Sequence, residues 1–484
     1  MPTIPETMPE KIAEKMIATL AAQRAAFTAE LPVSGAIRKD RLQRVVALLV
    51  DHGMAFAKSI SDDFGHRATQ TTMMSDINGT LRSLKSTIKQ IDSWMKPERR
   101  HLPLPLWLMG ARAGVEYQPK GVVGIIGPWN FPLTLTLEPL NGAFAAGNRA
   151  MIKFSEFTPA TGALLEQVVP NYFDSSELAV FTGGPDVGQA FAMLNFDHLM
   201  FTGSTGVGKH ILHAAADNLV PVTLELGGKS PAIIGRSANL AQSTGRIAMA
   251  KTLNAGQVCL APDYLLVPKE QEGAIIDGIR SSVTAMYPTM LDNPDYTSVL
   301  NAAHRDRLTA LLADARDKGA EVTEINPANE DFAASNGTKM PLNIVRNVTT
   351  DMKVMQEEIF GPILPVMTYD RIETAIDYVN THDHALALYY FGADSTEEGQ
   401  VLSRTISGGV TVNDCVMHVA METLPFGGIG PSGMGYYHGF DGFKTFSHGK
   451  SVFHQTRFNI AKLVGMMPPY GEKTQKTIER DFKI

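Results

Sequence analysis

The sequence contains only two cysteines, Cys259 and Cys415, among its 484 residues. Two thiols exclude both a disulfide framework and a four-cysteine zinc site. In a reducing compartment each isolated thiol is therefore either a buried apolar residue or a nucleophile.

Blocks of clustered Lys or Arg are also absent, and the formal net charge is only -7. Binding to a phosphate backbone needs a concentrated positive surface, so nucleic acid is not an expected partner. No stretch approaches the roughly 20 apolar residues of a membrane-spanning helix. The N-terminal segment MPTIPETMPEKIAEK has acidic residues where an export signal carries a basic and then an apolar run. We expect a cytoplasmic protein without a membrane partner.

Hydrophobic residues make up 44% of the chain and charged residues 19%, which is typical of a folded globular protein. Because 484 residues exceed one ordinary core, we expect two or three structural units. Residues 11 to about 96 have apolar positions at helical spacing, as in LQRVVALLVDHGMAFAKSI, and predict a helical layer.

From residue 112 the pattern changes to strand-like runs that alternate with helical ones. This alternation predicts the α/β class, with parallel sheets flanked by helices. A first region runs to about 226 and a second spans about 227 to 409. The chain beyond 410 is β-like and rich in glycine. Strand candidates include RAMIKF, LAVFTG, DHLMFTG and VPVTLEL in the first region, and PAIIG, YLLVP, PILPV and ALYYFG in the second.

The segment GPWNFPLTLTLEPLNGAFAAGN, residues 127–148, follows a strand and leads into a helix. Asn130 lies at the strand end, where its amide can donate hydrogens to an oxyanion that develops during acyl transfer. The alternative is an asparagine that satisfies the backbone of a turn.

Two further strand ends could bind a nucleotide. FTGSTGVGK, residues 201–209, is a turn whose amides at a helix start suit a pyrophosphate, although its glycines are not spaced G-x-G-x-x-G. The alternative is a tight strand-to-helix turn. IKFSE, residues 152–156, places Lys153 and Glu156 where a carboxylate can accept hydrogen bonds from a ribose. The alternative is a solvated ion pair.

A candidate base and a candidate nucleophile follow. Glu225, in LELGGKSP, lies in an apolar strand, and a low dielectric would increase its basicity. The alternative is a buried carboxylate held by the amides of Gly227 and Gly228. Cys259, in NAGQVCLAPDY, follows a small, flexible stretch, and a thiolate attacks carbonyl carbon readily. The alternative is a structural thiol, which is the interpretation of Cys415.

In this order, the five segments resemble the aldehyde dehydrogenase superfamily over essentially the whole chain. EEIFGP at 357–362 and LPFGGIGPSGMG at 424–435 match the same pattern. APDY after the cysteine resembles the dimeric class-3 branch. QPKGVVGIIGPWNFPLTLTLEPL and TFSHGKSVFHQTRFN are similar to bacterial coniferyl aldehyde dehydrogenases.

The resemblance implies the aldehyde dehydrogenase fold, divided into four parts, and a homodimer. The parts are a Rossmann-like cofactor domain at 1–98 and 119–226, an α/β catalytic domain at 227–409, a small β oligomerisation element at 99–118 and 410–450, and a C-terminal tail at 451–484. Exposed strand edges near 112–118 and 410–450 would favour the dimer.

The resemblance also implies catalytic roles. Cys259 would be the nucleophile, Glu225 the base that activates water or the thiol, and Asn130 with the Cys259 amide the oxyanion hole. No metal is expected, because His382 and His384 in NTHDHALA lack further ligands and are typical of a loop.

The implied cofactor is NAD or NADP. Its contacts would be Lys153 and Glu156 for the adenosine ribose, Gly203 and Ser204 by the pyrophosphate, Glu358 for the nicotinamide ribose, and Phe360 near the nicotinamide ring. Trp129 would be a further cofactor contact. Glu156 would repel a 2′-phosphate, which favours NAD, whereas a rotated side chain beside Lys153 would admit NADP.

The expected reaction is oxidation of an aldehyde to the acid. An apolar tunnel formed by Phe131, Leu135, Leu253, Leu260 and Met417 would suit aromatic or medium-chain aldehydes, unless these residues are ordinary core. A long-chain aldehyde enzyme of this branch would often carry a membrane anchor, and the chain ends in KTQKTIERDFKI, so we expect an aromatic aldehyde such as coniferyl aldehyde. The alternatives are an aliphatic aldehyde dehydrogenase, a CoA- or phosphate-acylating enzyme, which generally lacks the base, and a non-catalytic protein on this fold.

Overall fold

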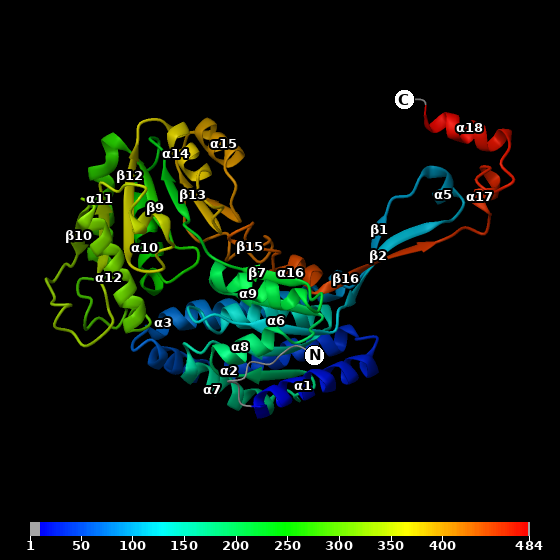
Figure 1. Ribbon diagram of the computed structural model, residues 1–484, viewed down its shortest axis with the longest axis horizontal. Helices are drawn as coiled ribbons and strands as arrows, with labels where there is room; N and C mark the ends of the chain where they lie inside the picture. The colour runs from blue at the N-terminus through cyan, green and yellow to red at the C-terminus, as the bar shows by residue number, and fades with distance from the viewer. Residues whose placement is uncertain (1–9, 483–484) are drawn as a thin grey trace.

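The computed structural model describes residues 10–482, which form three β-sheets, and helices cover the two larger sheets (Figure 1). Most of the N-terminal segment compared above with an export signal lies outside the described residues. The α/β class predicted from the alternation of strands and helices is confirmed.

A helical layer precedes the first strand, as the apolar spacing predicted. α2 buries a stripe that includes Leu42, Val45, Leu49 and Phe56 against α4, α6 and α7, since residues three and four apart share one helix face. The layer consists of α1 (Glu10–Glu30), α2 (Gly35–Asp63), α3 (Thr69–Thr72), the π-helix η1 (Met73–Asn78) and α4 (Gly79–Trp94).

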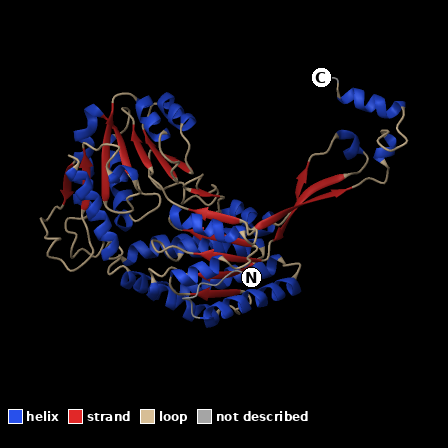
Figure 2. Cartoon of the chain, viewed as in Figure 1, coloured by secondary structure: helices blue, strands red, loops and turns tan. Residues whose placement is uncertain are grey.

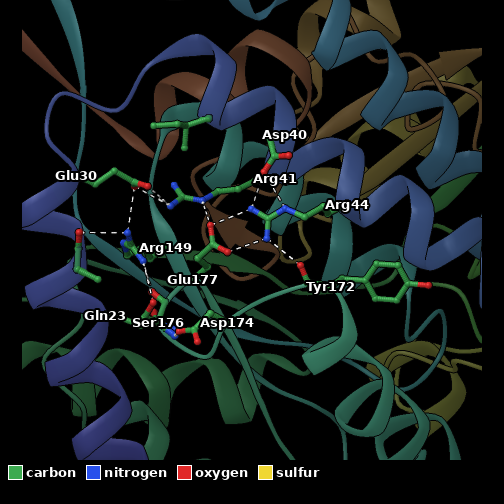
Figure 3. Close-up of polar contacts among 12 residues, drawn as sticks. Gln23, Glu30, Asp40, Arg41, Arg44, Arg149, Tyr172, Asp174, Ser176 and Glu177 are labelled. Atoms are coloured by element: carbon green, nitrogen blue, oxygen red, sulfur yellow. Dashed lines mark hydrogen bonds and ion pairs between the residues drawn. The ribbon is translucent and has the colours of Figure 1, made fainter.

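A network of ion pairs connects α1 and α2 to the edge of the neighbouring sheet (Figure 3). The buried Arg41 donates to Glu30 at 2.7 Å and to Glu177 at 3.0 Å. Arg44 donates to Glu177 at 2.7 Å, and Arg149 lies 3.2 Å from Glu30. Burial alone would raise the pKa of the Glu177 carboxyl, but hydrogen bonds from Arg44 and Arg41 and their charges lower it to about 2.

The six-stranded sheet has the order β15-β7-β6-β3-β4-β5, and only β15 is antiparallel. Val123 and Ile125 of β3 pack into one apolar cluster and Val122 and Ile126 into another, so both faces of the sheet are covered. Its strands are β3 (Val122–Ile126), β4 (Arg149–Lys153), β5 (Leu178–Phe181), β6 (His198–Thr202), β7 (Val222–Glu225) and β15 (Gly433–Met434). Its helices are α6 (Thr134–Ala146), α7 (Pro159–Val168), η2 (Val169–Asn171), α8 (Pro185–Ala192) and α9 (Thr205–Ala216).

The seven-stranded sheet has the order β10-β11-β12-β9-β8-β13-β14, with β10 antiparallel at one edge. Its strands are β8 (Pro231–Ile234), β9 (Tyr264–Pro268), β10 (Glu321–Ile325), β11 (Leu342–Arg346), β12 (Ile363–Tyr369), β13 (Ala387–Phe391) and β14 (Gly409–Val412). The helices of this part are α10 (Leu240–Thr252), η3 (Leu253–Gly256), η4 (Lys269–Gln271), α11 (Glu272–Met286), α12 (Ala302–Asp317), α13 (Lys353–Gln356), α14 (Ile372–Asn380) and α15 (Ser395–Arg404).

A third, three-stranded sheet forms an arm that projects from the rest of the molecule (Figure 2). It comprises β1 (Glu98–Arg100), β2 (Arg112–Pro119) and β16 (Ser447–His454), all antiparallel. α5 (Leu104–Leu108) connects β1 to β2, α16 (Gly439–Thr445) precedes β16, and α17 (Ile460–Leu463) and α18 (Glu472–Asp481) follow it.

The expected boundaries fall at different kinds of places in this fold. The boundary at 226/227 lies between β7 and β8, where the chain passes from one large sheet to the other. The boundary at 409/410 lies inside β14, and the strands of 410–450 are divided among all three sheets. β16 also continues to His454, beyond the expected start of the tail. Local alternation predicts a strand but does not identify the sheet that it joins.

Candidate active site

Four predicted motifs meet at one edge of the six-stranded sheet. β7, β6, β3 and β4 are parallel neighbours, so their carboxyl ends share that edge. Asn130 follows β3, Lys153 ends β4, Gly203 follows β6 and Glu225 ends β7. The fold therefore assembles residues that are up to about a hundred positions apart in the sequence.

Cys259 comes from the other half of the chain, in the loop between η3 and β9. Asn254, Ala255 and Gly256 just before it have left-handed backbone conformations, with φ of 50°, 54° and 73°. Such a conformation costs a non-glycine residue roughly 1–3 kcal/mol, so the surroundings must hold it. A Cβ on Gly256 would lie 2.5 Å from the Gly361 carbonyl oxygen, so the close approach requires glycine.

Asn130 is joined to this loop by hydrogen bonds. Its Nδ2 donates to the Gln257 carbonyl at 3.1 Å, and its own carbonyl accepts from Asn254 Nδ2 at 3.1 Å. Because a primary amide carries two hydrogens, one remains for a ligand. The predicted oxyanion donor and the loop of the predicted nucleophile thus form one unit, which is more than the turn-stabilising role considered for Asn130.

Glu225 is 2% exposed, and neither of its carboxylate oxygens has a hydrogen-bond partner among the described residues. The amides of the following glycine turn therefore do not hold it. Burial raises the pKa of this carboxyl well above its ordinary value. A carboxylate with increased basicity and free oxygens is suited to accept a proton from a substrate, water or thiol.

Cys259 is a partly exposed residue, but its thiol is largely removed from water. Loss of hydration, followed by the charges of Glu358 and Glu225, raises its pKa to about 12. The backbone amides of Cys259 and Leu260 reach the sulfur and act in the opposite direction. A thiol in this state needs a base before it can attack a carbonyl.

Glu358 lies directly over the turn that follows the candidate base. A Cβ on Gly227 would be 2.3 Å from Glu358 Oε1, so the carboxylate occupies the space that glycine leaves free. Burial, followed by the charge of Asp263, raises the pKa of Glu358 to about 8. Asp263 Oδ1 accepts from the Ile359 amide at 3.0 Å, and Asp263 pairs with Lys229. These contacts hold the EEIFGP segment beside β7.

The two predicted aromatic cofactor contacts also touch each other. The rings of Trp129 and Phe360 meet edge to face at 5.3 Å, and His304 packs against Trp129 at 5.0 Å. Phe360 has a φ of 51°, so its surroundings hold the backbone in a conformation unusual for this residue type. The pair forms an aromatic wall between β3 and the segment that carries Glu358.

The side chains and amides predicted to bind a dinucleotide have hydrogen-bond donors and acceptors available for it. Lys153 is 2% exposed and donates to Glu156 at 2.6 Å, so this is not the solvated pair considered as an alternative. Two ammonium hydrogens and a partly exposed carboxylate remain for ribose hydroxyls. Ser204 caps α9 by accepting from the Val207 amide at 3.4 Å, which leaves other amides of the helix start for a pyrophosphate.

A buried ion pair that the sequence pattern does not reveal supports Asn130. Arg67 and Asp76 lie 2.7 Å apart, and both side chains are fully buried. Arg67 Nη1 donates to the Asn130 carbonyl at 2.9 Å. Asp76 Oδ1 accepts from the Leu133 amide at 3.2 Å and the Thr134 amide at 3.3 Å. Both residues lie among the N-terminal helices, where only helical spacing was visible.

Lys229 and Asp263 were missed too, although each stands inside a quoted motif, LELGGKSP and NAGQVCLAPDY. Their positions directly after Gly228 and Pro262, within motifs assigned to the site, could have indicated them. Cys415 is 1% exposed, in agreement with its interpretation as a packing residue.

The residues proposed to wall a tunnel do not all behave alike. Phe131 and Leu260 belong to the apolar cluster against which Leu135, Leu253 and Cys259 pack. Met417 lies on the loop after β14 and is 44% exposed. The first four thus belong to or pack against the same apolar core as the nucleophile, and Met417 lies on a more open surface.

Within residues 10–482, no group of three His, Cys, Asp or Glu side chains is arranged to hold a metal ion. The ring of His382 instead contacts the Tyr378 carbonyl at 2.8 Å. No helix in the same part of the chain has the length and apolar character needed to cross a bilayer.

Comparison with known proteins agrees with this geometry. Residues 3–452 match the aldehyde dehydrogenase family. A probable coniferyl aldehyde dehydrogenase of Caulobacter vibrioides is 53% identical over 465 residues, 96% of either chain. The substrate-bound structure of Staphylococcus aureus AldH has a TM-score of 0.89 and 35% identity, and covers 97% of this chain and 99% of its own. The structure of an indole-3-acetaldehyde dehydrogenase with NAD+ has a TM-score of 0.83 and 27% identity, and covers 92% of this chain and 89% of its own.

The overall fold predicted from the motifs is confirmed by these relatives. Both the matched range and the 53% identity extend over nearly the whole sequence. The chain belongs to the aldehyde dehydrogenase family.

Proposed function

We propose that this protein oxidises an aromatic aldehyde such as coniferyl aldehyde to its carboxylic acid, with NAD as the electron acceptor and Cys259 as the nucleophile. The main support is the convergence of Cys259, Asn130 and Glu225 from separate parts of the fold, with both Glu225 oxygens unpartnered within the described part of the chain. The Caulobacter relative named for coniferyl aldehyde supports the substrate class.

The first step forms a bond between the Cys259 sulfur and the aldehyde carbon, and Glu225 takes up the thiol proton. The carbonyl oxygen becomes an oxyanion that accepts from the free hydrogen of Asn130 Nδ2 and from the Cys259 amide. A bound nicotinamide would supply the acceptor for the hydride that leaves the former aldehyde carbon. The carbon–sulfur bond remains, and the product on Cys259 is a thioester.

The second step hydrolyses that thioester. Glu225 first releases the thiol proton to solvent, which is the proton of the net reaction. It then removes a proton from a water molecule, which attacks the acyl carbon, and the same oxyanion donors stabilise the tetrahedral intermediate. The carbon–sulfur bond then breaks and the thiolate leaves. The net reaction consumes aldehyde, water and NAD+, and yields acid, NADH and a proton.

The cofactor would be held by the residues at the strand ends. Lys153 and Glu156 would bind the adenosine ribose, the start of α9 at Gly203 and Ser204 the pyrophosphate, and Glu358 the second ribose. The Glu156 carboxylate is partly exposed and would repel a 2′-phosphate, which supports NAD over NADP. Trp129 and Phe360 would contact the nicotinamide side.

NADH formation by the purified protein tests this proposal. Coniferaldehyde, benzaldehyde and decanal would each be supplied with NAD or NADP, with Cys259→Ala as the control. We expect the highest kcat/KM with coniferaldehyde and NAD, and no turnover in the control. Higher kcat/KM with decanal would replace the aromatic substrate class by the aliphatic one. A requirement for CoA would contradict hydrolysis through Glu225.

We also propose that the protein is a cytoplasmic homodimer. Both cysteines are free, which fits a reducing compartment. The arm exposes strand edges and large apolar side chains such as Trp107 and Phe453, which a second copy could cover. In this proposal the six-stranded part binds the cofactor, the seven-stranded part supplies Cys259, and the arm forms the oligomerisation element. Light scattering of the full chain and of Trp107→Ser would test the dimer, and a monomeric full chain would contradict it.

A further inference from the structure

Behind the catalytic residues, a cluster of acidic and amide side chains joins three parts of the fold. Ser83 comes from α4, Glu138 and Asn141 from α6, and Glu422 from the loop between β14 and β15. Ser83 Oγ lies 2.7 Å from Glu138 Oε2 and 2.7 Å from Glu422 Oε2. Asn141 Nδ2 donates to Ser83 Oγ at 3.0 Å.

These contacts require an additional proton. A serine hydroxyl has one hydrogen, which can be donated to only one of the two carboxyls. The other short contact is a hydrogen bond only if that carboxyl is protonated and donates to Ser83. Burial, followed by the charge of Glu422, raises the pKa of Glu138 well above its ordinary value, and burial also raises that of Glu422. The cluster therefore contains a carboxylic acid and a carboxylate that share one proton through Ser83.

The cluster has more acceptors than donors. Asn141 is 3% exposed, and its Oδ1 has no hydrogen-bond partner among the described residues. A cavity of about 10 Å³ beside it is lined by Glu138, Asn141, Tyr437 and His438, among others. His438 Nδ1 also lacks a partner in the described structure. This space holds about one water-sized group, so a hydroxyl fits its size and its polarity.

The cluster lies close to the reacting centre. Glu138 is on the helix that begins just after Asn130, one turn beyond Leu135, which packs in the same apolar cluster as Cys259. Tyr437 provides an independent indication of position. Burial raises the pKa of its phenol well above the ordinary value. The charges of both catalytic residues, Glu225 and Cys259, and of both carboxyls of the cluster raise it further. The buried Tyr437, which also lines the cavity, therefore lies near both groups.

We propose that Ser83, Glu138, Asn141 and Glu422 form the subsite that recognises the phenolic hydroxyl of a hydroxyaryl aldehyde. The inference rests on the proposed oxidation of an aromatic aldehyde and identifies the substrate group that the protein recognises. The phenol donates its hydrogen to an acceptor of the cluster while the aldehyde carbon reaches Cys259. An aldehyde without the hydroxyl leaves a buried acceptor without a donor, which disfavours its binding.

Two aldehydes that differ only in this hydroxyl provide the test. Coniferaldehyde and 3-methoxycinnamaldehyde would be compared with the wild-type enzyme and NAD. We expect kcat/KM to be about 10- to 100-fold higher for coniferaldehyde, the range given by one hydrogen bond to a charged group. Equal values for the two aldehydes would overturn the subsite while leaving the proposed function intact. Oxidation of neither would contradict the proposed function itself.

Glu138→Gln and Glu422→Gln replace a carboxylate by an amide and prevent the sharing of the proton. Each variant is expected to lower the preference for coniferaldehyde to within about threefold, with little change for 3-methoxycinnamaldehyde. Glu422 is on a loop and partly exposed, so its variant remains informative if Glu138→Gln does not fold. Glu166→Gln on α7, where Glu166 accepts from Thr182, is the matched control and should retain the wild-type preference. An unchanged preference in both test variants would overturn the proposal.

Discussion

Replacing Arg67 by methionine tests whether the buried ion pair positions the oxyanion donor. Arg67 donates to Asp76 at 2.7 Å, to Ser75 at 3.1 Å and to the Asn130 carbonyl at 2.9 Å. Methionine retains much of the volume but none of these hydrogen bonds. Removing one partner of a buried pair costs about 3–5 kcal/mol, because the remaining charge is left without compensation. We therefore expect Arg67→Met to be less stable by that amount.

The same change should also lower turnover. Asn130 would keep its side chain but lose a hydrogen bond that fixes its backbone, and a displacement of about 1 Å near a reacting centre can cost roughly 10²-fold. Loss of the whole donor, as in Asn130→Ala, costs about 2.7–4 kcal/mol of transition-state stabilisation. We expect kcat of Arg67→Met to fall between the wild type and Asn130→Ala. Arg67→Lys retains the charge without the planar fork and should be intermediate.

Urea unfolding and steady-state kinetics at a temperature where the variants remain folded separate the two effects. Arg38→Met is the matched control, since Arg38 is also buried and donates to a backbone carbonyl, that of Ala145, away from the site. It should lower stability without lowering kcat. A folded Arg67→Met enzyme with wild-type kcat would refute the positioning role.

The stability loss in Arg67→Met should depend on pH. Burial raises the pKa of Asp76 in the wild type, and the charge of Arg67 partly opposes that rise. Without Arg67 the folded-state pKa rises further above the unfolded value. The contribution of protonated Asp76 to the stability of Arg67→Met is therefore fully present below about pH 4. It is lost as pH rises through the folded-state pKa of Asp76. The difference from wild type should be smaller near about pH 5 than near about pH 8; a difference independent of pH would contradict this reasoning.

Three further predictions concern single residues. In the cofactor-free protein, iodoacetamide should label Cys259 slowly near neutral pH, because the thiol pKa is about 12. The labelling rate, measured by mass spectrometry, should rise about tenfold per pH unit, and a pH-independent rate would contradict this. Glu225→Gln should accumulate the acyl-enzyme, seen as a stopped-flow burst of about one NADH per site, and the absence of a burst would argue against Glu225 as the hydrolytic base. Glu177→Gln should cost about 1–2 kcal/mol near neutral pH, because the folded-state pKa is lowered to about 2 and solvent screening of the half-buried carboxylate reduces the corresponding free energy. This stability is present above about pH 4.5 and is lost as pH falls through about 2, so urea unfolding across that range should show the difference from wild type disappear.

Much of the fold follows from local pattern. The apolar runs RAMIKF and PAIIG became β4 and β8, because fully buried parallel strands need continuous apolar residues. β10 was not predicted, since its sequence EVTEI forms an edge strand with only one buried residue. The assignment of β14 to the seven-stranded sheet depends on pairing with β13, which is a long-range contact without a local signal.

The candidate site divides in the same way. The sequence alone determined which residues have the required chemistry: a single thiol after a flexible turn at Cys259, a carboxylate in an apolar strand at Glu225, and an amide at a strand end at Asn130. These assignments depend on residue type and near neighbours, which the order of amino acids contains.

The tertiary structure decided what surrounds those groups. Burial leaves the Glu225 oxygens without partners among the described residues, Arg67 reaches Asn130 from the loop between α2 and α3, more than 60 positions away, and Ser83 joins two carboxyls separated by nearly 300 residues. Proton affinity and orientation depend on desolvation and on distances of a few ångströms, and both are defined only when distant segments pack together.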